Sequence, residues 1–210
     1  QDNYDGKQQE PTVLSMAITD SGTRGAIIVI DLESGRGWLA LDGHPSTQID
    51  KSVTVAIEGK PLVRPDGRQP AFASDGIAIS NDGKTLYWQA LTGKTLYSIA
   101  TEKLRSDVSE RDRAAAVKTV ATTAVADGLW MSKAGTLYIT SPTDYSIRRL
   151  AGTSTEIVLT DKRLRWPDTF AEGPDGTIYV TASHIQDTQW FTPGAPPSIR
   201  TELFSFAPTR

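Results

Sequence analysis

Three aspartates open similar short segments of the chain, and their type and spacing make them the first candidates for chemistry. Asp75 and Asp127 are followed by glycine and Asp168 by threonine, and a short apolar stretch follows each pair. The three aspartates lie 52 and 41 residues apart, close to the length of one four-stranded propeller blade. If each begins the innermost strand of a blade, the three carboxylates converge at one mouth of a central channel.

Carboxylates at such a mouth could hold a hard cation such as Ca²⁺ through oxygen ligands. The cation could then polarise a carbonyl group or activate water. The competing interpretation is structural, because an aspartate followed by glycine often fixes the start of a strand by hydrogen bonding to nearby backbone N–H groups.

Aromatic residues accompany the aspartates. Trp166 and Phe170 flank Asp168, and Phe72 precedes Asp75. Rings beside carboxylates suit an aromatic amine, through stacking, cation–π contact and an ion pair. The alternative is that these rings only pack between blades.

Histidine offers few further candidates, since the chain has two. His184 follows a predicted strand end near the mouth, where it could act as a general base or serve as a hydrogen-bonded loop residue. The sequence does not show a complete catalytic set of nucleophile, base and orienting group. This makes an enzymatic function less expected.

The elements that must position these residues are short strands in repeated units. Turns with glycine at 81–84, 133–136 and 174–177 separate β-branched and aromatic runs such as TLYW, TLYIT and TIYVT. We expect outer strands at 117–123 and 155–160. Residues 101–117 are charged and compatible with a helix, and the proline-containing stretch 41–73 is expected to be a loop over one face. The pattern predicts an all-β propeller.

Composition excludes several classes of protein. The chain has 210 residues, of which 38% are apolar, and this suits a globular domain. Its net charge of −3 argues against a nucleic-acid partner. No apolar run approaches the ~18 residues that a membrane-spanning helix needs, so we expect no membrane insertion. Cysteine is absent, which excludes disulfides, zinc–thiolate sites and cysteine nucleophiles.

Several segments resemble the major royal jelly protein/Yellow family, in particular its bacterial and fungal members. These segments are SDGIAISNDGKTLYWQALTGKTLYSI, ADGLWMSKAGTLYIT, RLRWPDTFAEGPDGTIYVTASHIQ and TELFSF, and the likeness covers about residues 17–206. The resemblance implies a six-bladed propeller that is usually exported, hence secreted or periplasmic. Insect members of the family include royal jelly proteins, cuticle pigmentation proteins linked to dopachrome conversion, and salivary proteins that bind biogenic amines.

DGIAIS and DGLWMS also resemble the calcium-dependent lactonase propellers of the gluconolactonase family. That resemblance implies Asp75 and Asp127 as metal ligands. The favoured expectation is an exported propeller that binds a small aromatic or amine ligand at Asp75, Asp127, Asp168, Trp166, Phe170, Phe72 and His184. A metal-dependent lactone or ester hydrolase is the alternative, and a tautomerase and a purely structural propeller also stay open.

Length sets the last expectation. Six blades of ~45 residues need about 270 residues, whereas this chain supplies about four blades, at 1–60, 61–123, 124–160 and 161–210 of a single domain. Residues 1–22 resemble the remains of a blade's first strand with an irregular join. An open propeller exposes apolar blade faces. We therefore expect self-association, or a missing segment that completes the ring, with a closed four-bladed ring as the alternative.

Overall fold

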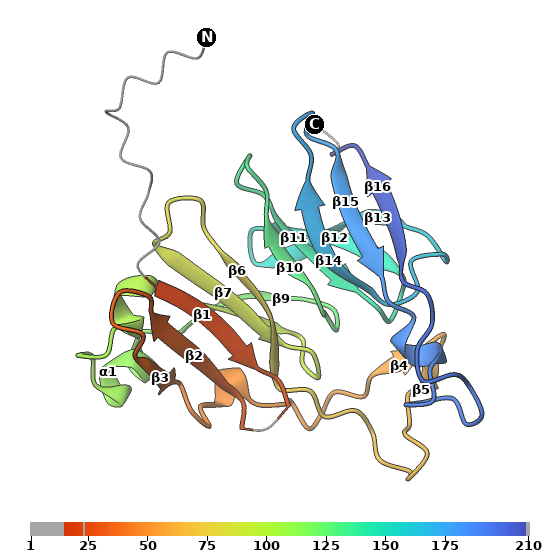
Figure 1. Cartoon of the computed structure of the whole chain (residues 1–210), viewed down its shortest axis with the longest axis horizontal. Coiled ribbons are helices and arrows are strands. Elements are labelled where there is room, and N and C mark those ends of the chain that lie inside the picture. The colour runs from red at the N-terminus through yellow and green to blue at the C-terminus, as the bar shows by residue number, and fades with distance from the viewer. Residues whose placement is uncertain (1–14, 23, 209–210) are drawn as a thin grey trace.

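Glycine turns and β-branched runs fold the chain into antiparallel sheets that stand side by side (Figure 1). The computed structural model describes residues 15–22 and 24–208. The first sheet has the order β1 (Ser15–Asp20), β2 (Ala26–Asp31), β3 (Gly37–Ala40). The second has the order β6 (Ser74–Ile79), β7 (Thr85–Ala90), β8 (Thr95–Ala100), β9 (Lys118–Thr122).

The next two sheets repeat this meander. The third has the order β10 (Leu129–Met131), β11 (Leu137–Ser141), β12 (Ser146–Ala151), β13 (Ser154–Thr160). The fourth has the order β14 (Pro167–Glu172), β15 (Ile178–Ala182), β16 (Glu202–Phe206). The architecture is therefore all-β, with each sheet built from consecutive strands as in propeller blades.

Helical structure is confined to short connections. The charged segment between β8 and β9 forms a 3₁₀ turn, Thr101–Leu104, and the helix α1, Glu110–Ala115. The Ser109 side chain begins α1 by accepting a hydrogen bond from the backbone N–H of Asp112. Within the described ranges, no helix has the length and apolarity needed to cross a bilayer.

The first strands of neighbouring sheets approach each other very closely. A Cβ atom placed on Gly76 in β6 would lie 2.3 Å from the carbonyl oxygen of Asp127, and one on Gly128 would lie 1.7 Å from that of Asp168. Neither glycine has a positive φ, so it is the space beside the backbone that requires glycine here. The Asp-Gly pairs thus mark the contacts between successive inner strands.

Apolar clusters between the sheets hold this arrangement. Ile27, Leu86 and Trp88 belong to the cluster between the first and second sheets, and Leu96 and Ile139 to the cluster between the second and third. The third and fourth sheets share a group of rings whose neighbouring centroids lie 5.9–6.2 Å apart: Trp130, Tyr138, Phe170 and Phe206. Burial of these side chains supplies the main free energy of folding.

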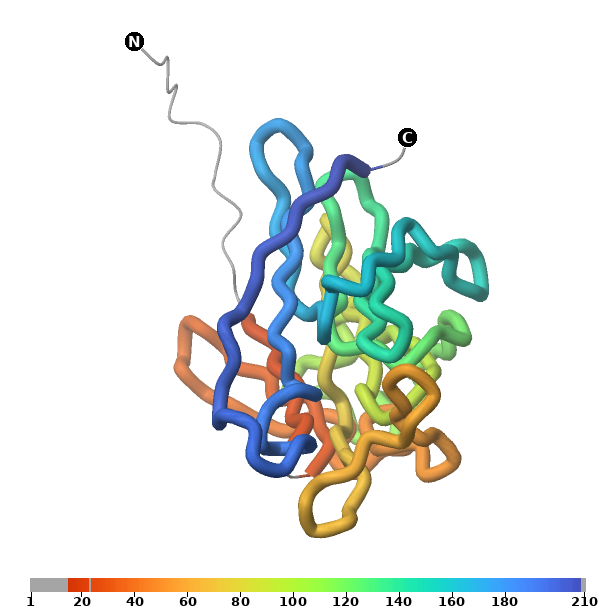
Figure 2. Tube along the Cα trace, turned by 90° about the vertical axis from the view of Figure 1, so that its right-hand side faces the viewer, coloured from red at the N-terminus to blue at the C-terminus, as the bar shows by residue number. Residues whose placement is uncertain are grey.

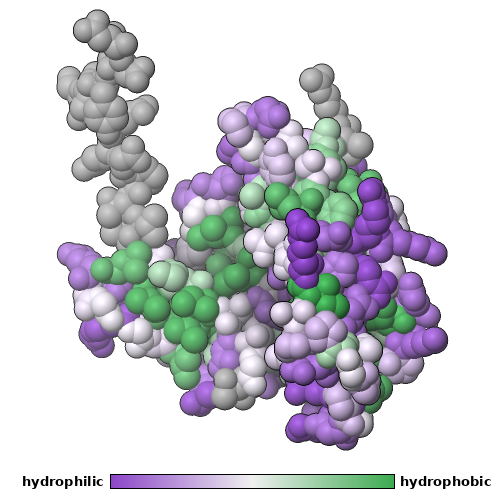
Figure 3. Space-filling model, turned by 45° about the vertical axis from the view of Figure 1, so that its right-hand side comes forward, coloured by the Kyte–Doolittle hydropathy of each residue, from purple (hydrophilic) through white to green (hydrophobic). Residues whose placement is uncertain are grey.

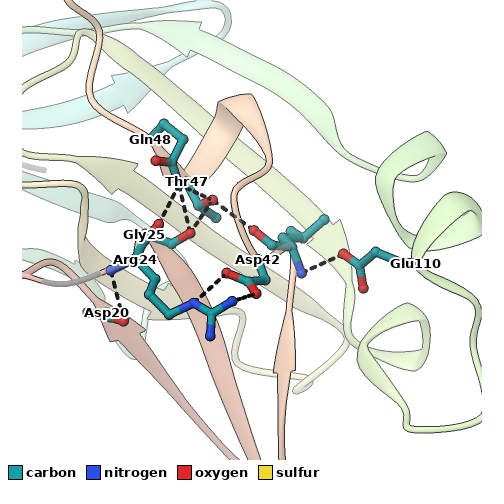
Figure 4. A network of polar contacts seen from close by, with 8 residues as sticks. Asp20, Arg24, Gly25, Asp42, Thr47, Gln48 and Glu110 are labelled. Carbon is teal, nitrogen blue, oxygen red and sulfur yellow. Dashed lines mark hydrogen bonds and ion pairs between the residues drawn. The ribbon is translucent and has the colours of Figure 1, made fainter.

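A polar network joins the first sheet to the segments that follow it (Figure 4). Thr47 donates a hydrogen bond from Oγ1 to the carbonyl oxygen of Gly25 at 2.9 Å, and Gln48 donates from Nε2 to the same oxygen at 2.8 Å. Arg24 pairs with Asp42, while Glu110 of α1 accepts a hydrogen bond from the backbone N–H of Leu41. The network fixes the exit of the first sheet against α1.

The irregular stretch 41–73 lies at one end of the sheets and carries a short hairpin, β4 (Ala56–Ile57) and β5 (Lys60–Pro61). The loop between β15 and β16 lies at the same end (Figures 1 and 2). This is the end at which β6 and β14 begin. We call it the mouth, and it is where the predicted site residues must be sought.

The sequence predicts that residues 1–22 contain the remains of a blade's first strand, but the strand found there, β1, holds a different position. Residues 1–14 lie outside the described residues. β1 runs opposite to β6, because Thr19 near the end of β1 contacts Asp75 at the start of β6, with 2.6 Å between Thr19 Oγ1 and the Asp75 carbonyl oxygen. Since β6, β10 and β14 meet near their starts, β1 holds the place of a second strand.

Replacing Gly128 by alanine tests the close approach of the inner strands. The new methyl group would collide with the carbonyl oxygen of Asp168, so we expect Gly128→Ala to lower the free energy of unfolding by about 3 kcal/mol. Urea unfolding followed by circular dichroism measures the change. Gly22→Ala is the control, because nothing lies within 4 Å of a Cβ at that position. Equal stability of the two variants would contradict the packing described here.

Candidate functional site

The contacts between the inner strands bring three carboxylates to the mouth. Asp75 is the second residue of β6, Asp168 is the second residue of β14, and Asp127 lies two residues before β10. Gly76 and Gly128 hold these strand starts against one another. The aspartates lie close enough to interact, because the charge of Asp168 raises the pKa of both Asp75 and Asp127.

Burial and like charge make ionisation of these carboxylates unfavourable. Burial, and then the charge of Asp168, raise the pKa of Asp75 to about 6. Burial, followed by the charges of Asp168 and Asp75, raises the pKa of Asp127 well above its usual value. Burial also raises the pKa of Asp168, against a hydrogen bond with Thr169. Within the described residues, no lysine or arginine forms an ion pair with any of the three, so the cluster resists carrying its full negative charge.

Trp166 is the aromatic residue that contacts the cluster directly. Its indole Nε1 donates a hydrogen bond to Asp127 Oδ2 at 2.5 Å, and this bond opposes the rise in the Asp127 pKa. The residue is buried and has a φ of +60°, which is unusual for a bulky side chain. The ring stacks on Phe191, with centroids 6.4 Å apart. Trp166 therefore fixes the orientation of one carboxylate of the cluster.

Phe72 belongs to a second aromatic group at the mouth. The guanidinium carbon of Arg64 lies 5.8 Å from the centre of the Phe72 ring and 5.7 Å from that of Trp190. Arg64 thus joins the stretch 41–73 to the loop between β15 and β16 by cation–π contacts. The sequence analysis singled out Phe72 but missed Arg64, whose second ring partner, Trp190, lies far away along the chain.

Phe170 and His184 have other partners. Phe170 is buried in the ring group between the third and fourth sheets, against Trp130 and Tyr138. Nε2 of His184 lies 3.0 Å from Glu202 Oε2, and its Nδ1 lies 3.5 Å from Asp187 Oδ2. These contacts place His184 in a polar group that ties β16 to the loop before it.

Unused hydrogen-bonding capacity gathers at the mouth. Among the described residues, the buried side-chain atoms without a hydrogen-bond partner are Arg64 Nε, Ser74 Oγ and both amide atoms of Gln186. Ser74 precedes Asp75 in β6, and Gln186 lies in the loop that packs over Trp166. A buried polar group without a partner costs about 1–3 kcal/mol, and so each of these atoms could accept or donate a hydrogen bond to a polar ligand or bound water.

The described part of the chain contains no group of three or more histidine, aspartate or glutamate side chains arranged to hold a metal ion. The assignment of Asp75 and Asp127 as metal ligands therefore stays a prediction from resemblance. In chemical terms the mouth offers carboxylates, an indole N–H donor that is already engaged, and unpaired amide and hydroxyl groups.

Replacing Asp75 by asparagine tests the electrostatic cost of the cluster. Because the pKa of Asp75 is raised in the folded state, the fold is most stable when this carboxyl is protonated. It loses stability as the pH rises from about 4 through about 6. We expect Asp75→Asn to raise the free energy of unfolding by about 3 kcal/mol at pH 8 and to leave it unchanged at pH 4, as measured by urea unfolding.

Asp82 supplies a control of opposite sign. Hydrogen bonds from Ser80 and Lys84 lower the pKa of this carboxylate in the turn between β6 and β7. Asp82→Asn should therefore destabilise the protein at pH 8, and the effect should decrease as the pH falls below about 4. A stability of Asp75→Asn that follows the wild type at every pH would contradict the raised pKa.

Known proteins share this architecture. The sequence profile described as major royal jelly protein matches residues 6–163 of the chain. No curated protein sequence matches it. Among solved structures, a nidogen/laminin complex has a TM-score of 0.51 and 15% identity, and covers 80% of this chain and 52% of its own. A gluconolactonase of Xanthomonas campestris has a TM-score of 0.50 and 16% identity, and covers 92% and 58%.

The chain thus spans little more than half the length of these two structures. At such low identity the likeness concerns the fold alone, which is that of a β-propeller, as the repeats predict. The family profile covers about three quarters of the sequence, including β1, β6, β10 and the aspartates Asp75 and Asp127. The chain belongs to the major royal jelly protein family.

Proposed function

We propose that this chain is part of an exported propeller that binds a small aromatic amine at the mouth of its channel. Export is expected from the family. The amine is expected from the carboxylates Asp75, Asp127 and Asp168, because a cation is the partner that such a cluster lacks among the described residues. The observation that carries the proposal is the rise in the pKa of all three carboxyls without a lysine or arginine partner.

A bound ammonium group would relieve the repulsion in the cluster. It would stabilise the ionised form of the carboxylates by Coulomb attraction and by charge-assisted hydrogen bonds, which are stronger than neutral ones. The electrostatic repulsion among the carboxylates would be relieved on binding, and this relief would contribute to affinity for a cation. A neutral ligand of the same shape would not recover it.

The surroundings suit the remainder of an aromatic amine. Phe72 and Trp190 present rings at the mouth, with Arg64 between them. The buried hydroxyl of Ser74 and the amide of Gln186 can exchange hydrogen bonds with ring substituents such as hydroxyl groups. Binding sites of this kind combine apolar walls with a few polar groups that fix the orientation of the ligand.

Titration with tryptamine tests this function. Tryptamine should bind to the whole chain, while tryptophol, its neutral alcohol analogue, should bind at least about tenfold more weakly, because a hydrogen bond to a charged group is worth about 1.5–3 kcal/mol. Affinity for tryptamine should rise about tenfold between pH 5 and pH 7, as Asp75 with its pKa of about 6 ionises. Isothermal titration calorimetry measures both differences.

Asp127→Asn provides the matched variant. Asparagine retains an oxygen that can accept the hydrogen bond of Trp166 but carries no charge, so tryptamine affinity should fall about tenfold. Asp82→Asn, in the turn at the opposite end of β6, should bind as the wild type does. Equal affinity of the wild type for tryptamine and tryptophol would refute the amine site.

The alternative function is metal-dependent hydrolysis of a lactone or ester, which the likeness to a gluconolactonase fold and the acidic mouth favour. Calcium separates the two proposals. If the site binds amines, millimolar Ca²⁺ should shift the melting temperature of the wild type and of Asp75→Asn equally. A larger shift in the wild type, together with Ca²⁺-dependent cleavage of a lactone, would support the hydrolase and displace the amine proposal.

A further inference from the structure

A compact loop closes on itself in the connection from β15 to β16, and we call this segment, residues 184–196, the mouth loop. Each backbone hydrogen bond that residues 185–196 form within the described structure joins two residues of the mouth loop. One of them runs from Gln189 N to the Pro196 carbonyl oxygen at 3.0 Å and ties the end of the loop to its middle. The loop therefore keeps its shape without backbone support from the sheets, as compact surface loops with close ends do.

The mouth loop is anchored at its first residue and loosely connected at its last. His184 N donates a hydrogen bond to the Arg165 carbonyl oxygen at 3.0 Å. At the other end, residues 197–201 lead back to β16, and no backbone hydrogen bond involves them in the described part of the chain. A segment without such bonds can change its dihedral angles at low cost. The loop can thus swing about His184 as one body, as hinged elements do.

Side chains hold the mouth loop against the rest of the molecule. Ile185 packs on the apolar cluster beneath the loop, and Phe191 belongs to that cluster. The face shown in Figure 3 is mainly hydrophilic at this end of the molecule, so the loop has a wet outer side and an apolar inner side. Three contacts join a loop residue to a residue of the body: Asp187 to Arg165, Trp190 to Arg64 and Phe191 to Trp166.

The closed position buries Gln186 at a cost. The residue is 5% exposed, and neither Oε1 nor Nε2 has a hydrogen-bond partner among the described residues. Arg64 Nε, at the contact with Trp190, is buried without a partner as well. Water would satisfy these groups if the loop moved away, so part of the free energy that closure gains from apolar contact is offset.

A single aromatic residue links the mouth loop to the aspartates. Trp166 stacks on Phe191 of the loop and donates a hydrogen bond from Nε1 to Asp127 Oδ2. It is 1% exposed in the closed position. Movement of the loop away from the body would therefore uncover Trp166 and open the side of the mouth next to Asp127.

We propose that the mouth loop is a flap, which swings as one body about His184 and opens the mouth beside Trp166. In the open position, Phe191 leaves Trp166, Trp190 leaves Arg64, and water reaches the amide of Gln186. The movement itself does not depend on what binds at the mouth. Only the role of the flap in admitting an amine to Asp127 rests on the function proposed above.

Single-cysteine labelling of the whole chain tests the flap, because the chain has no cysteine of its own. Gln186→Cys places a thiol on the buried side of the flap. Ile147→Cys places one on β12, in the same apolar cluster but outside the flap. Under native conditions, N-ethylmaleimide should modify Gln186→Cys at least about tenfold faster, because opening uncovers it without global unfolding. Equal rates would overturn the proposal.

Further substitutions in the Gln186→Cys chain test the contacts that close the flap. Trp190→Ala should speed labelling about threefold, the factor expected for an exposed cation–π contact. Asp187→Asn should speed it about tenfold by removing a charge-assisted contact with Arg165. Glu156→Gln, which removes the same kind of contact between β13 and β12, should leave the rate unchanged. If Trp190→Ala and Asp187→Asn also leave it unchanged, these contacts do not hold a flap.

Hydrogen exchange distinguishes a swinging flap from a loop that unravels. A flap that moves as one body keeps its internal hydrogen bonds. The amide hydrogens of Gln189 and Ala195, which bond inside the loop, should therefore report a smaller open fraction than thiol labelling does. Equal open fractions by the two methods would mean that the loop unravels, and this would overturn the proposal.

Tryptamine tests the role of the flap at the amine site. At about ten times its Kd, tryptamine should slow the labelling of Gln186→Cys about tenfold, because a ligand held behind the flap stabilises the closed position by mass action. Binding in calorimetry without slower labelling would overturn the control of the site by the flap. Absence of tryptamine binding would refute the amine proposal alone, since the labelling of Gln186→Cys and Ile147→Cys still decides whether the flap opens.

Discussion

A methyl group has no room between the first strands of neighbouring sheets, and the position of the candidate site follows from this constraint. Gly76 and Gly128 let each inner strand lie directly against the backbone of the next, at the carbonyl groups of Asp127 and Asp168. The residues that make the contact are the aspartates themselves or their direct neighbours. Close packing of the backbones and convergence of the carboxylates are therefore the same geometric fact.

That geometry sets the chemistry of the mouth. Carboxylates that converge in a partly buried place cannot all ionise at low cost, and the pKa of each is accordingly raised. Folding does not gain from the like charges of this arrangement, and the proposed amine site is built on that cost. The hydrogen bond from Trp166 to Asp127 fixes the direction of one carboxyl group and, by favouring its ionised form, opposes the rise in its pKa.

The sequence predicted the repeated strands, the glycine turns and the convergence of Asp75, Asp127 and Asp168 on one end, because these depend on local patterns that recur at blade spacing. It could not predict that Phe170 packs with Trp130 and Tyr138, or that Arg64 lies between two rings, because such contacts join residues that no local pattern connects. The position of β1 within its sheet could not be predicted from the sequence either. Its apolar pattern fits a first or a second strand, and only the contact of Thr19 with Asp75 decides between them.

The group of rings formed by Trp130, Tyr138, Phe170 and Phe206 has a mechanical consequence. These rings belong to β10, β11, β14 and β16, so they connect the third sheet to both the first and the last strand of the fourth. A force that pulls on the C-terminal strand is therefore carried by face and edge contacts between rings as well as by the hydrogen bonds of β16 with β15. If the third and fourth sheets slid past each other, all of these ring contacts would have to break together. The junction between these two sheets is therefore stiff.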